Sequence, residues 1–480
     1  MGVLSGLEPE RVFYYFEEIT KIPHGTYNTK AISDFCVEFA KNHNLEYIQD
    51  RLNNVIIKKP GTAGYETSEP VMLQGHLDMV CEKTDESKHD FEKDPLSLII
   101  KDGDIYADNT TLGGDDGIAV AMTLAILEDQ TIEHPPIEAV FTTEEEIGMD
   151  GAEALDFTPL KGKTLINIDS EEEGIFTVGC AGGLRVTSTL PFEYVEKEGV
   201  VLSIKIRGLL GGHSGIEAHK QRGNAHVLMG RLLNYLNNAM PVHLIDVVGG
   251  SKDNVISRAN TTRICIAEAD KDNCLAMINE MADAWKNEFL DDEPELEVTV
   301  SEDDSDKMAT LETSGMVIRY LRLMPNGVFG FERAIEGQVE TSLNAGIVKT
   351  ENDSFIISHM IRSSIESKKT MLKEQLAALA ELCGGTSDAQ GDYPAWAYRA
   401  ESKLRDTMEA VFERVYGRKA EIMTIHAGLE CGLFLGKRPE LDCVSFGPDM
   451  FDVHSTNEHI NIDSVTRSYK YLLEVLRELK

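Results

Sequence analysis

Four short β-rich runs separated by helical segments constrain the fold of this chain more strongly than any other feature. The runs are residues 54–59, 70–76, 137–143 and 164–169. The segments with apolar residues at helical spacing are residues 9–20, 29–43 and 117–129. This alternation favours a mixed, mostly parallel sheet covered by helices, because parallel strands need crossover connections that are usually helical. We therefore expect an α/β domain at the start of the chain.

The pattern changes in the middle of the chain and returns near its end. After the glycine-rich stretch 179–185, strands with alternating polarity are interspersed with long amphipathic helices. Helix and strand patterns typical of the first region resume towards the C-terminus. If both ends complete one sheet, the α/β domain comprises residues 1–183 plus 394–480, and residues 184–393 form an inserted α+β domain.

Composition limits the partners of the chain. Its 46 basic and 82 acidic residues give a net charge of −36, which repels nucleic acid and anionic membrane surfaces. The apolar run 117–127 is far shorter than the roughly 20 residues that a membrane-spanning helix requires. Residues 1–16 lack a basic segment followed by an apolar one, so no secretory signal is expected. We expect a cytoplasmic protein with no nucleic-acid or membrane partner.

Acidic residues and histidines gather where the predicted strands end. They are His76, Asp78, Asp115, Asp116, Glu144, Glu145, Glu146, Asp169 and His454. In open α/β sheets, ligands bind outside the carboxyl ends of the strands. Each residue alone has a structural explanation: a hydrogen-bonded histidine, an aspartate pair that caps a helix, a solvated turn of glutamates, or an Asx-turn.

Taken together, these residues indicate a metal site. Carboxylates crowded into one cleft repel one another, and burying them without a counter-charge is costly. A divalent cation resolves that conflict. Two imidazoles plus carboxylates suit zinc or a similar first-row ion, and a shared carboxylate suits a pair of ions. Magnesium and calcium fit less well because they prefer all-oxygen ligation.

A set of motifs, spread over essentially the whole chain, adds a family resemblance. The motifs are, in order, GHLDMV, LGGDDG, TTEEEIG, NIDSEEEG, LLGGHSG, HAGLECG and VHSTNEHINID. Together they resemble the co-catalytic zinc metallopeptidase family that contains aminoacylase and carboxypeptidase G, and most closely its aminoacyl-histidine dipeptidase branch. The resemblance implies hydrolysis of unblocked dipeptides, including Xaa-His peptides such as β-alanyl-histidine. It also implies two divalent metal ions per subunit, with zinc favoured and cobalt or manganese as alternatives.

The resemblance assigns a role to each residue of the predicted metal site. Asp115 corresponds to the carboxylate that bridges both ions. His76 and Asp169 would complete the ligands of one ion, and Glu146 and His454 those of the other. The Asp115–Asp116 peptide bond is commonly cis in relatives.

Two further carboxylates have implied roles beside the ligands. Asp78 corresponds to an aspartate that orients the imidazole of His76. Glu145 corresponds to the general base, which takes a proton from the attacking water and passes it to the leaving amine.

The resemblance also assigns residues of the middle region. His213 corresponds to a histidine that stabilises the oxyanion in the partner subunit's site, so a homodimer formed through the inserted lid domain is expected. Asn254 and Arg362 correspond to contacts of the substrate's terminal carboxylate. Gly428 would either let substrate approach the backbone or serve packing. Without the resemblance, GGHSG would be interpreted as a structural turn and Arg362 as a surface residue.

Alternatives remain open at this stage. Within the family, an N-acyl amino acid deacylase or a tripeptidase would share the same metal site. A non-catalytic binding protein would be expected to lack ligands or the base, which are all present. His24 and Thr26 stand where relatives often have Arg and Ser, which leaves substrate contacts near the N-terminus undefined.

Overall fold

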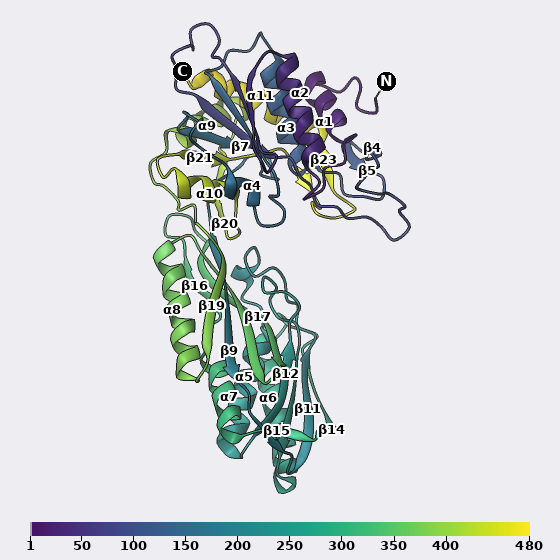
Figure 1. The fold of residues 1–480 in the computed structure, drawn as a ribbon, viewed down its shortest axis with the longest axis vertical. Helices are drawn as coiled ribbons and strands as arrows, with labels where there is room; N and C mark the ends of the chain where they lie inside the picture. Colours follow the sequence, from purple (N-terminus) through teal and green to yellow (C-terminus); the bar gives the residue numbers. More distant parts are fainter. Residues whose placement is uncertain (1) are drawn as a thin grey trace. The chain divides into compact units, whose positions relative to one another are not determined.

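The chain divides into two compact units in the structure, which is a computed structural model that describes residues 2–480 (Figure 1). Unit 1 comprises the chain up to Gly179 together with Tyr398–Thr424 and Leu429–Lys480. Unit 2 comprises Cys180–Ala397 and Ile425–Gly428. Along the sequence, the chain passes from one unit to the other at Gly179/Cys180 and at Ala397/Tyr398, and the short segment Ile425–Gly428 is grouped with unit 2.

Within residues 2–480, unit 1 is built on an eight-stranded sheet with helices around it. The strand order is β1 (Glu46–Gln49), β2 (Val55–Lys59), β6 (Ile137–Thr142), β3 (Val71–His76), β7 (Thr164–Asn167), β21 (Asp442–Ser445), β8 (Ile175–Cys180) and β20 (Glu421–Ile425). The pairs β6–β3, β3–β7 and β7–β21 are parallel, whereas β1–β2, β2–β6 and β21–β8 are antiparallel. The structure confirms the predicted mixed α/β fold, in which a parallel centre has antiparallel edges.

The parallel centre aligns the strand ends that carry the candidate site. In the register, His76 lies opposite Thr142, and Gln74 lies opposite Asn167. The residues that follow β3, β6 and β7 consequently leave the sheet at one common edge.

The helices of unit 1 cover this sheet and each other. They are α1 (Glu10–Ile19), α2 (Lys30–Asn42), α3 (Gly114–Glu128), α4 (Asp150–Ala154), α9 (Lys403–Tyr416), α10 (Glu430–Lys437) and α11 (Ile462–Glu478). The α3 helix packs on β3, β6 and α1, and all of its residues from Gly114 to Leu127 are buried. Such burial explains why α3 is apolar on every side. Gly75 permits the close packing, since a Cβ at that position would lie 2.5 Å from Asp116 Oδ2 and 2.7 Å from Ala119 Cβ.

A smaller sheet in unit 1 supports the loop that carries His454. Its strand order is β22 (Met450–Phe451), β23 (His459–Asn461), β5 (Asp104–Ala107) and β4 (Leu98–Lys101). The C-terminal end of the chain therefore pairs with an N-terminal hairpin, as the purple-to-yellow colouring of unit 1 shows (Figure 1).

Over the described residues, unit 2 contains a nine-stranded antiparallel sheet. Its order is β14 (Glu297–Asp303), β11 (Val200–Arg207), β13 (Asn260–Ile266), β12 (His243–Gly249), β17 (Val339–Glu351), β18 (Ser354–Ser363), β9 (Gly182–Pro191) and β19 (Thr386–Tyr393), with β16 (Gly327–Phe331) on β17. A separate ribbon pairs β10 (Tyr194–Glu196) with β15 (Lys307–Ala309). The helices are α5 (Ala225–Ala239), α6 (Lys271–Phe289), α7 (Leu311–Leu323) and α8 (Glu366–Leu382).

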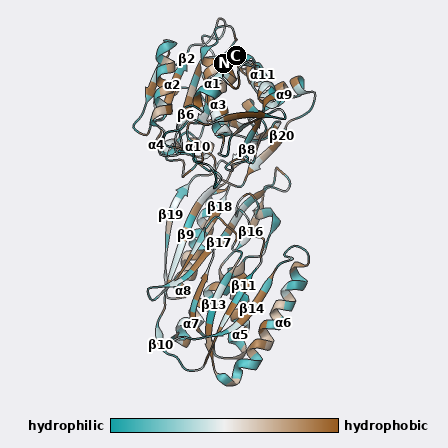
Figure 2. Ribbon diagram, turned by 90° about the vertical axis from the view of Figure 1, so that its right-hand side faces the viewer, coloured by the Kyte–Doolittle hydropathy of each residue, from teal (hydrophilic) through white to brown (hydrophobic). Residues whose placement is uncertain are grey.

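Hydrophobic residues of these strands and helices form the core of unit 2. Figure 2 shows them in brown along strands such as β13, and shows brown and teal alternating along α6. In α6 the buried side chains are Cys274, Met277, Ile278 and Trp285, which lie three, four or seven residues apart along one face. No helix among residues 2–480 combines the length and the apolarity needed to cross a membrane.

Candidate functional site

The sheet edge described above brings the predicted ligands together in unit 1. His76 is the last residue of β3, Glu145 and Glu146 follow β6, and Asp169 follows β7. Asp115 lies in the first turn of α3, and its peptide bond with Asp116 is cis, as the resemblance implied.

Asp115 lies between two imidazoles. Its Oδ1 is 3.0 Å from His76 Nε2, and its Oδ2 is 3.1 Å from His454 Nε2. Each oxygen of one buried carboxylate therefore faces a different histidine. This is the arrangement expected of a carboxylate shared by two ions.

The candidate ligands form overlapping groups around the two histidines, and Glu145 and Glu146 form one such group with His76. Asp115, Glu146 and His454 offer ligand atoms within 4.8 Å of one another, and Glu146 Oε2 is 3.0 Å from His454 Nε2. On the other side, His76 Nε2 is 3.8 Å from Asp169 Oδ1. The cluster around His76 and Asp169 also includes Asp116, which the sequence analysis had left without a role.

Asp78 fixes the orientation of both His76 and the glutamates. The backbone oxygen of Asp78 is 2.9 Å from His76 Nδ1, so Nδ1 carries the proton and Nε2 faces the cluster. The carboxylate of Asp78 lies 3.6 Å from the same ring nitrogen. It also accepts hydrogen bonds from the backbone N–H groups of Glu145 (3.1 Å) and Glu146 (3.4 Å).

The electrostatics of the cluster show an excess of carboxylate charge. Burial, and then the neighbouring carboxylates of Glu430, Glu146 and Asp115, raise the pKa of Glu145 to about 8 although His76 opposes the rise. Burial and the charges of Asp116 and Asp115 likewise raise the pKa of Asp169 well above its usual range. The cluster thus favours a cation among these carboxylates.

The pKa values of the two imidazoles also rise, which favours their charged form. Hydrogen bonds with Asp115 and Glu146 raise the pKa of His454 to about 11. Burial acts to lower the pKa of His76, but Asp115 and Asp78 outweigh it, so that pKa also lies well above its usual range.

The donor set fits divalent metal ions. Two imidazole nitrogens and several carboxylate oxygens suit a first-row ion such as zinc. In addition, Glu146 Oε1 and Asp116 Oδ1 are buried without a hydrogen-bond partner among the described residues. A buried carboxylate oxygen without a partner is costly unless a cation or a donor meets it.

Glu144 differs from its two neighbours. It has a positive φ of 59°, and its buried carboxylate accepts hydrogen bonds from the backbone N–H of Tyr27 and from Thr29 Oγ1. Glu144 therefore fastens the N-terminal segment to the site. Nearby, Thr26 Oγ1 donates to the Asp78 carboxylate (2.9 Å), so the threonine supplies the hydroxyl that a serine would supply.

His24, the other departure from relatives, is buried in the same N-terminal segment. Its Nδ1 contacts the backbone oxygen of Ile22, and burial lowers its pKa. These contacts are with the backbone of its own segment.

The candidate residues of the middle region lie together in unit 2. An isolated β-bridge pairs His213 with Val255. The backbone N–H of Ser214 donates to the backbone oxygen of Asn254 at 2.9 Å. Gly215 lies beside them, since a Cβ there would be 3.0 Å from His213 Cε1 and 3.1 Å from Arg362 Nε.

The same position explains why residue 215 is glycine. Its Cβ would lie 2.2 Å from the backbone oxygen of His426, two residues before Gly428. The segment that carries Gly428 therefore belongs to this cluster of unit 2.

His213 is poised as a neutral hydrogen-bond donor. The backbone N–H groups of Gly215 (3.2 Å) and Ile216 (3.0 Å) both donate to His213 Nδ1, so the ring proton resides on Nε2. Burial, and then the charge of Arg362, lower the pKa of His213 to about 4. An N–H donor without net charge suits a developing oxyanion.

Arg362 is a buried cation without an ionic partner. Arg362 is only 5% exposed, and its Nη1 donates a hydrogen bond to Tyr393 Oη at 2.9 Å. No ion pair with a carboxylate involves Arg362 in the part of the chain that the structure describes, and its Nε has no partner there. Burial and the charge of Arg362 also lower the pKa of His426 to about 3. An anion would offset the cost of burying this guanidinium.

The sequence analysis missed two buried glutamates close to the candidate metal ligands. Glu430 bonds with Gln74 and Thr142, which belong to β3 and β6 beneath the site. Glu458 contacts the backbone at the start of α3. Both residues lie inside the motifs HAGLECG and VHSTNEHINID, but a single glutamate, whether it begins a helix (Glu430) or lies in a loop (Glu458), carries no signal of burial.

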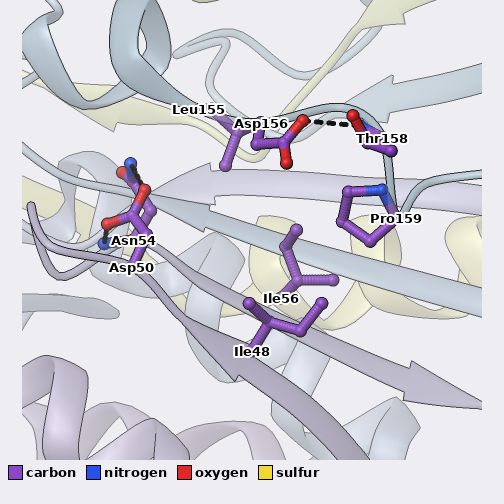
Figure 3. A pocket seen from close by; sticks show the side chains of 8 residues that line it. All are labelled: Ile48, Asp50, Asn54, Ile56, Leu155, Asp156, Thr158 and Pro159. Carbon is purple, nitrogen blue, oxygen red and sulfur yellow. Dashed lines mark hydrogen bonds between the residues drawn. The ribbon is translucent and has the colours of Figure 1, made fainter.

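A pocket elsewhere in unit 1 has a different character (Figure 3). It is mainly apolar, and the polar residues that line it pair with one another: Asn54 Nδ2 donates to Asp50 Oδ2 at 2.7 Å, and the Thr158 N–H donates to Asp156 Oδ1 at 2.8 Å. No histidine or basic side chain lines it. We therefore place the candidate site at the strand ends.

Comparisons with known proteins indicate a peptidase family. The sequence pattern of Peptidase family M20/M25/M40 matches residues 72–478. The chain is 38% identical to the cytosol non-specific dipeptidase of Escherichia coli (strain K12), over 100% of this chain and 99% of that protein.

Two solved structures match this chain over nearly its whole length. The aminoacylhistidine dipeptidase of Vibrio alginolyticus superposes with a TM-score of 0.93 at 35% identity, covering 99% of this chain and 98% of that one. The aminopeptidase PepT of Bacillus cereus superposes with a TM-score of 0.57 at 16% identity, covering 98% and 99% of the two chains. The second likeness concerns the fold alone.

Proposed function

The chain belongs to Peptidase family M20/M25/M40, and from this premise we propose that it is a metal-dependent dipeptidase that hydrolyses unblocked dipeptides, including Xaa-His peptides. Membership of this family confirms the resemblance that the motifs indicated. The observation that carries the proposal is the carboxylate of Asp115, whose two oxygens face His76 and His454, with Glu145 beside the same cluster.

The proposed ligands are divided between two ions. Asp115 would bridge the ions, His76 and Asp169 would hold one, and Glu146 and His454 would hold the other. When bound, two divalent ions supply Lewis acidity, which lowers the pKa of water and polarises a carbonyl. Zinc is proposed because of the imidazole and carboxylate donors, with cobalt and manganese as alternatives.

The chain's own residues would supply proton transfer and positioning. The carboxylate of Glu145 accepts a proton from the attacking water and delivers it to the nitrogen of the leaving amine. Asp78 holds the backbone of Glu145 and the ring of His76, so the base and one ligand keep a fixed relation. Glu146 is the next residue along the chain, and its carboxylate contacts His454.

Residues of unit 2 would bind the substrate's terminal carboxylate and the oxyanion that forms during the reaction. We assign the substrate's terminal carboxylate to Arg362 and Asn254, supported by the buried, unpaired guanidinium. Gly428 would let the substrate approach the backbone. His213, with its proton on Nε2, would donate to the oxyanion in the partner subunit's site. This role implies a homodimer formed through unit 2. A cytoplasmic location fits the name of the Escherichia coli relative.

A substrate panel tests the activity. Purified protein is expected to hydrolyse free dipeptides such as β-alanyl-histidine faster than N-acyl amino acids or tripeptides. Treatment with a chelator should abolish turnover, and added Zn²⁺ should restore it, with Co²⁺ and Mn²⁺ as parallel arms. Faster turnover of the N-acyl amino acids or tripeptides would instead support one of the rival specificities. If no substrate is hydrolysed after zinc is restored, the proposed enzymatic activity is refuted.

Replacement of Arg362 by methionine tests carboxylate recognition. A hydrogen bond to a charged group contributes about 1.5–3 kcal/mol, so kcat/KM for a free dipeptide should fall about 10- to 100-fold. The wild-type protein should discriminate a dipeptide from the same dipeptide amidated at its C-terminus, and R362M should lose that discrimination.

Arg263 provides the matched control for that measurement. It also lies in unit 2, but its guanidinium is already paired with Asp246 at 2.5 Å. R263M is expected to keep the wild-type ratio of dipeptide to amide turnover. A wild-type ratio in R362M would contradict the assigned contact.

A further inference from the structure

Glu458 makes an unusual set of contacts with the backbone of unit 1. The residue is 3% exposed and lies in the loop that also carries His454. Its Oε2 accepts hydrogen bonds from the N–H groups of Leu112 (2.8 Å) and Gly113 (3.2 Å). Its Oε1 accepts from Gly114 (2.8 Å) and Asp115 (3.4 Å). One carboxylate therefore contacts four consecutive N–H groups.

These contacts satisfy the start of α3. The first N–H groups of a helix have no partner inside the helix, and a nearby side chain often caps them. Gly113 occupies the cap position of α3 and has no side chain to do so. Water is a poor substitute because this end of the helix is buried. Glu458 supplies the missing acceptor from the other end of the chain.

The same contacts join two of the proposed metal ligands. Asp115 donates its own N–H to Glu458, and it has non-helical dihedral angles inside α3. His454 lies four residues before Glu458, and its Nε2 is 3.1 Å from Asp115 Oδ2. Movement of the Glu458 carboxylate would therefore change the position of Asp115 relative to His454.

We propose that Glu458 is a positioning residue that holds Asp115 in place to bridge two metal ions. The proposal rests on the proposed function, because it needs Asp115 to be a ligand. Glu458 does not itself bind metal or substrate. Its effect is to fix the backbone of Leu112–Asp115 so that both oxygens of Asp115 face their ligand groups.

Glu458 acts as a charged carboxylate in this arrangement. Each of its oxygens receives two N–H groups, so a carboxyl proton would point at donors and lose hydrogen bonds. Negative charge at the start of a helix is also favoured by the helix dipole.

Glu138 offers a matched control in the same unit. It is also 3% exposed, and its carboxylate accepts hydrogen bonds from the backbone N–H groups of Lys161 and Gly162 at 3.0 Å. It lies near the start of β6, whereas the candidate ligands follow the end of that strand. A change of Glu138 to Gln should disturb buried backbone contacts without changing the ligands.

The test compares zinc affinity in E458Q, E138Q and the wild-type full-length protein. Metal is removed with a chelator, and Zn²⁺ binding is measured in competition with a chromophoric chelator. The thermal midpoint of each metal-free protein is recorded as well. E458Q is expected to bind zinc about 10- to 100-fold more weakly than wild type, as is typical when a residue that supports a ligand is changed. E138Q should bind zinc within about 3-fold of wild type, even where its thermal midpoint falls by as much as that of E458Q.

A second variant keeps the test informative if E458Q misfolds. E458D keeps the charge but withdraws it by one methylene, so its zinc affinity should lie between those of wild type and E458Q. Wild-type affinity in E458Q or E458D, or equal weakening in E138Q, would overturn the role of Glu458 alone. Absence of zinc binding by the wild-type protein would overturn the proposed function together with it.

Discussion

Replacing Glu145 by alanine is expected to lower kcat by about 10²- to 10⁴-fold while the bound metal stays at the wild-type level. This expectation follows from the position of Glu145 beside the proposed metal ligands. Glu145 belongs to the acidic cluster: its carboxylate, that of Glu146 and the ring of His76 offer atoms within 4.8 Å of one another, and burial raises the pKa of Glu145 to about 8. Its neighbour Glu146 lies 3.0 Å from His454 and is the proposed metal ligand.

Adjacent glutamates provide the controls for this prediction. E146A should lose metal affinity as well as turnover, because one ion would forfeit a ligand. E144Q should retain most turnover and lose thermal stability instead, since Glu144 fastens Tyr27 and Thr29. Metal content, kcat and the thermal midpoint should therefore distinguish the three variants. Turnover near the wild-type rate in E145A would refute the assignment of the base.

Much of the fold could be predicted from the sequence because its signals are local. The runs at 70–76, 137–143 and 164–169 became β3, β6 and β7, which form the parallel centre with β21. Each run is short and apolar, and the buried helix α3 separates two of them. Periodicity and strand length suffice to identify such elements. The antiparallel edges depend on pairings between distant segments, such as β21 with β8, which no local pattern specifies.

The grouping of the candidate ligands could also be predicted, because strand ends in a parallel sheet share one edge. His76, Asp115, Glu146, Asp169 and His454 do lie together, in two groups around the Asp115 carboxylate. Their separate roles came from the resemblance and remain proposals.

Other features depend on tertiary contacts that the sequence does not encode locally. The proton on His213 Nε2 follows from two backbone N–H groups that point at Nδ1. The burial of Arg362 follows from packing in unit 2, whereas its sequence context suggested a surface arginine. The role inferred for Glu458 depends on a contact with Leu112, which lies 346 residues away.

Replacing Asp115 by asparagine is the change expected to remove metal and activity together. Both carboxylate oxygens face imidazoles, at 3.0 and 3.1 Å, so an amide would leave one ion without an anionic oxygen and would weaken the bridge to the other. The loss of zinc affinity should exceed the 10- to 100-fold typical of residues that only support a ligand. Turnover should be undetectable at zinc concentrations that saturate the wild-type protein.

Thermal or chemical unfolding with and without zinc measures this loss directly. A ligand at 100 times its dissociation constant stabilises the folded state by about 2.7 kcal/mol, and that increment should be present in the wild-type protein and absent in D115N. D442N is a suitable control, because Asp442 lies in β21 of the same sheet and its carboxylate accepts hydrogen bonds from Ser402 Oγ and the Leu404 N–H. It should keep the zinc-dependent increment even if its baseline stability falls. A full increment in D115N would show that Asp115 does not bridge the ions, whereas its loss in D115N and its retention in E145A would separate metal binding from proton transfer.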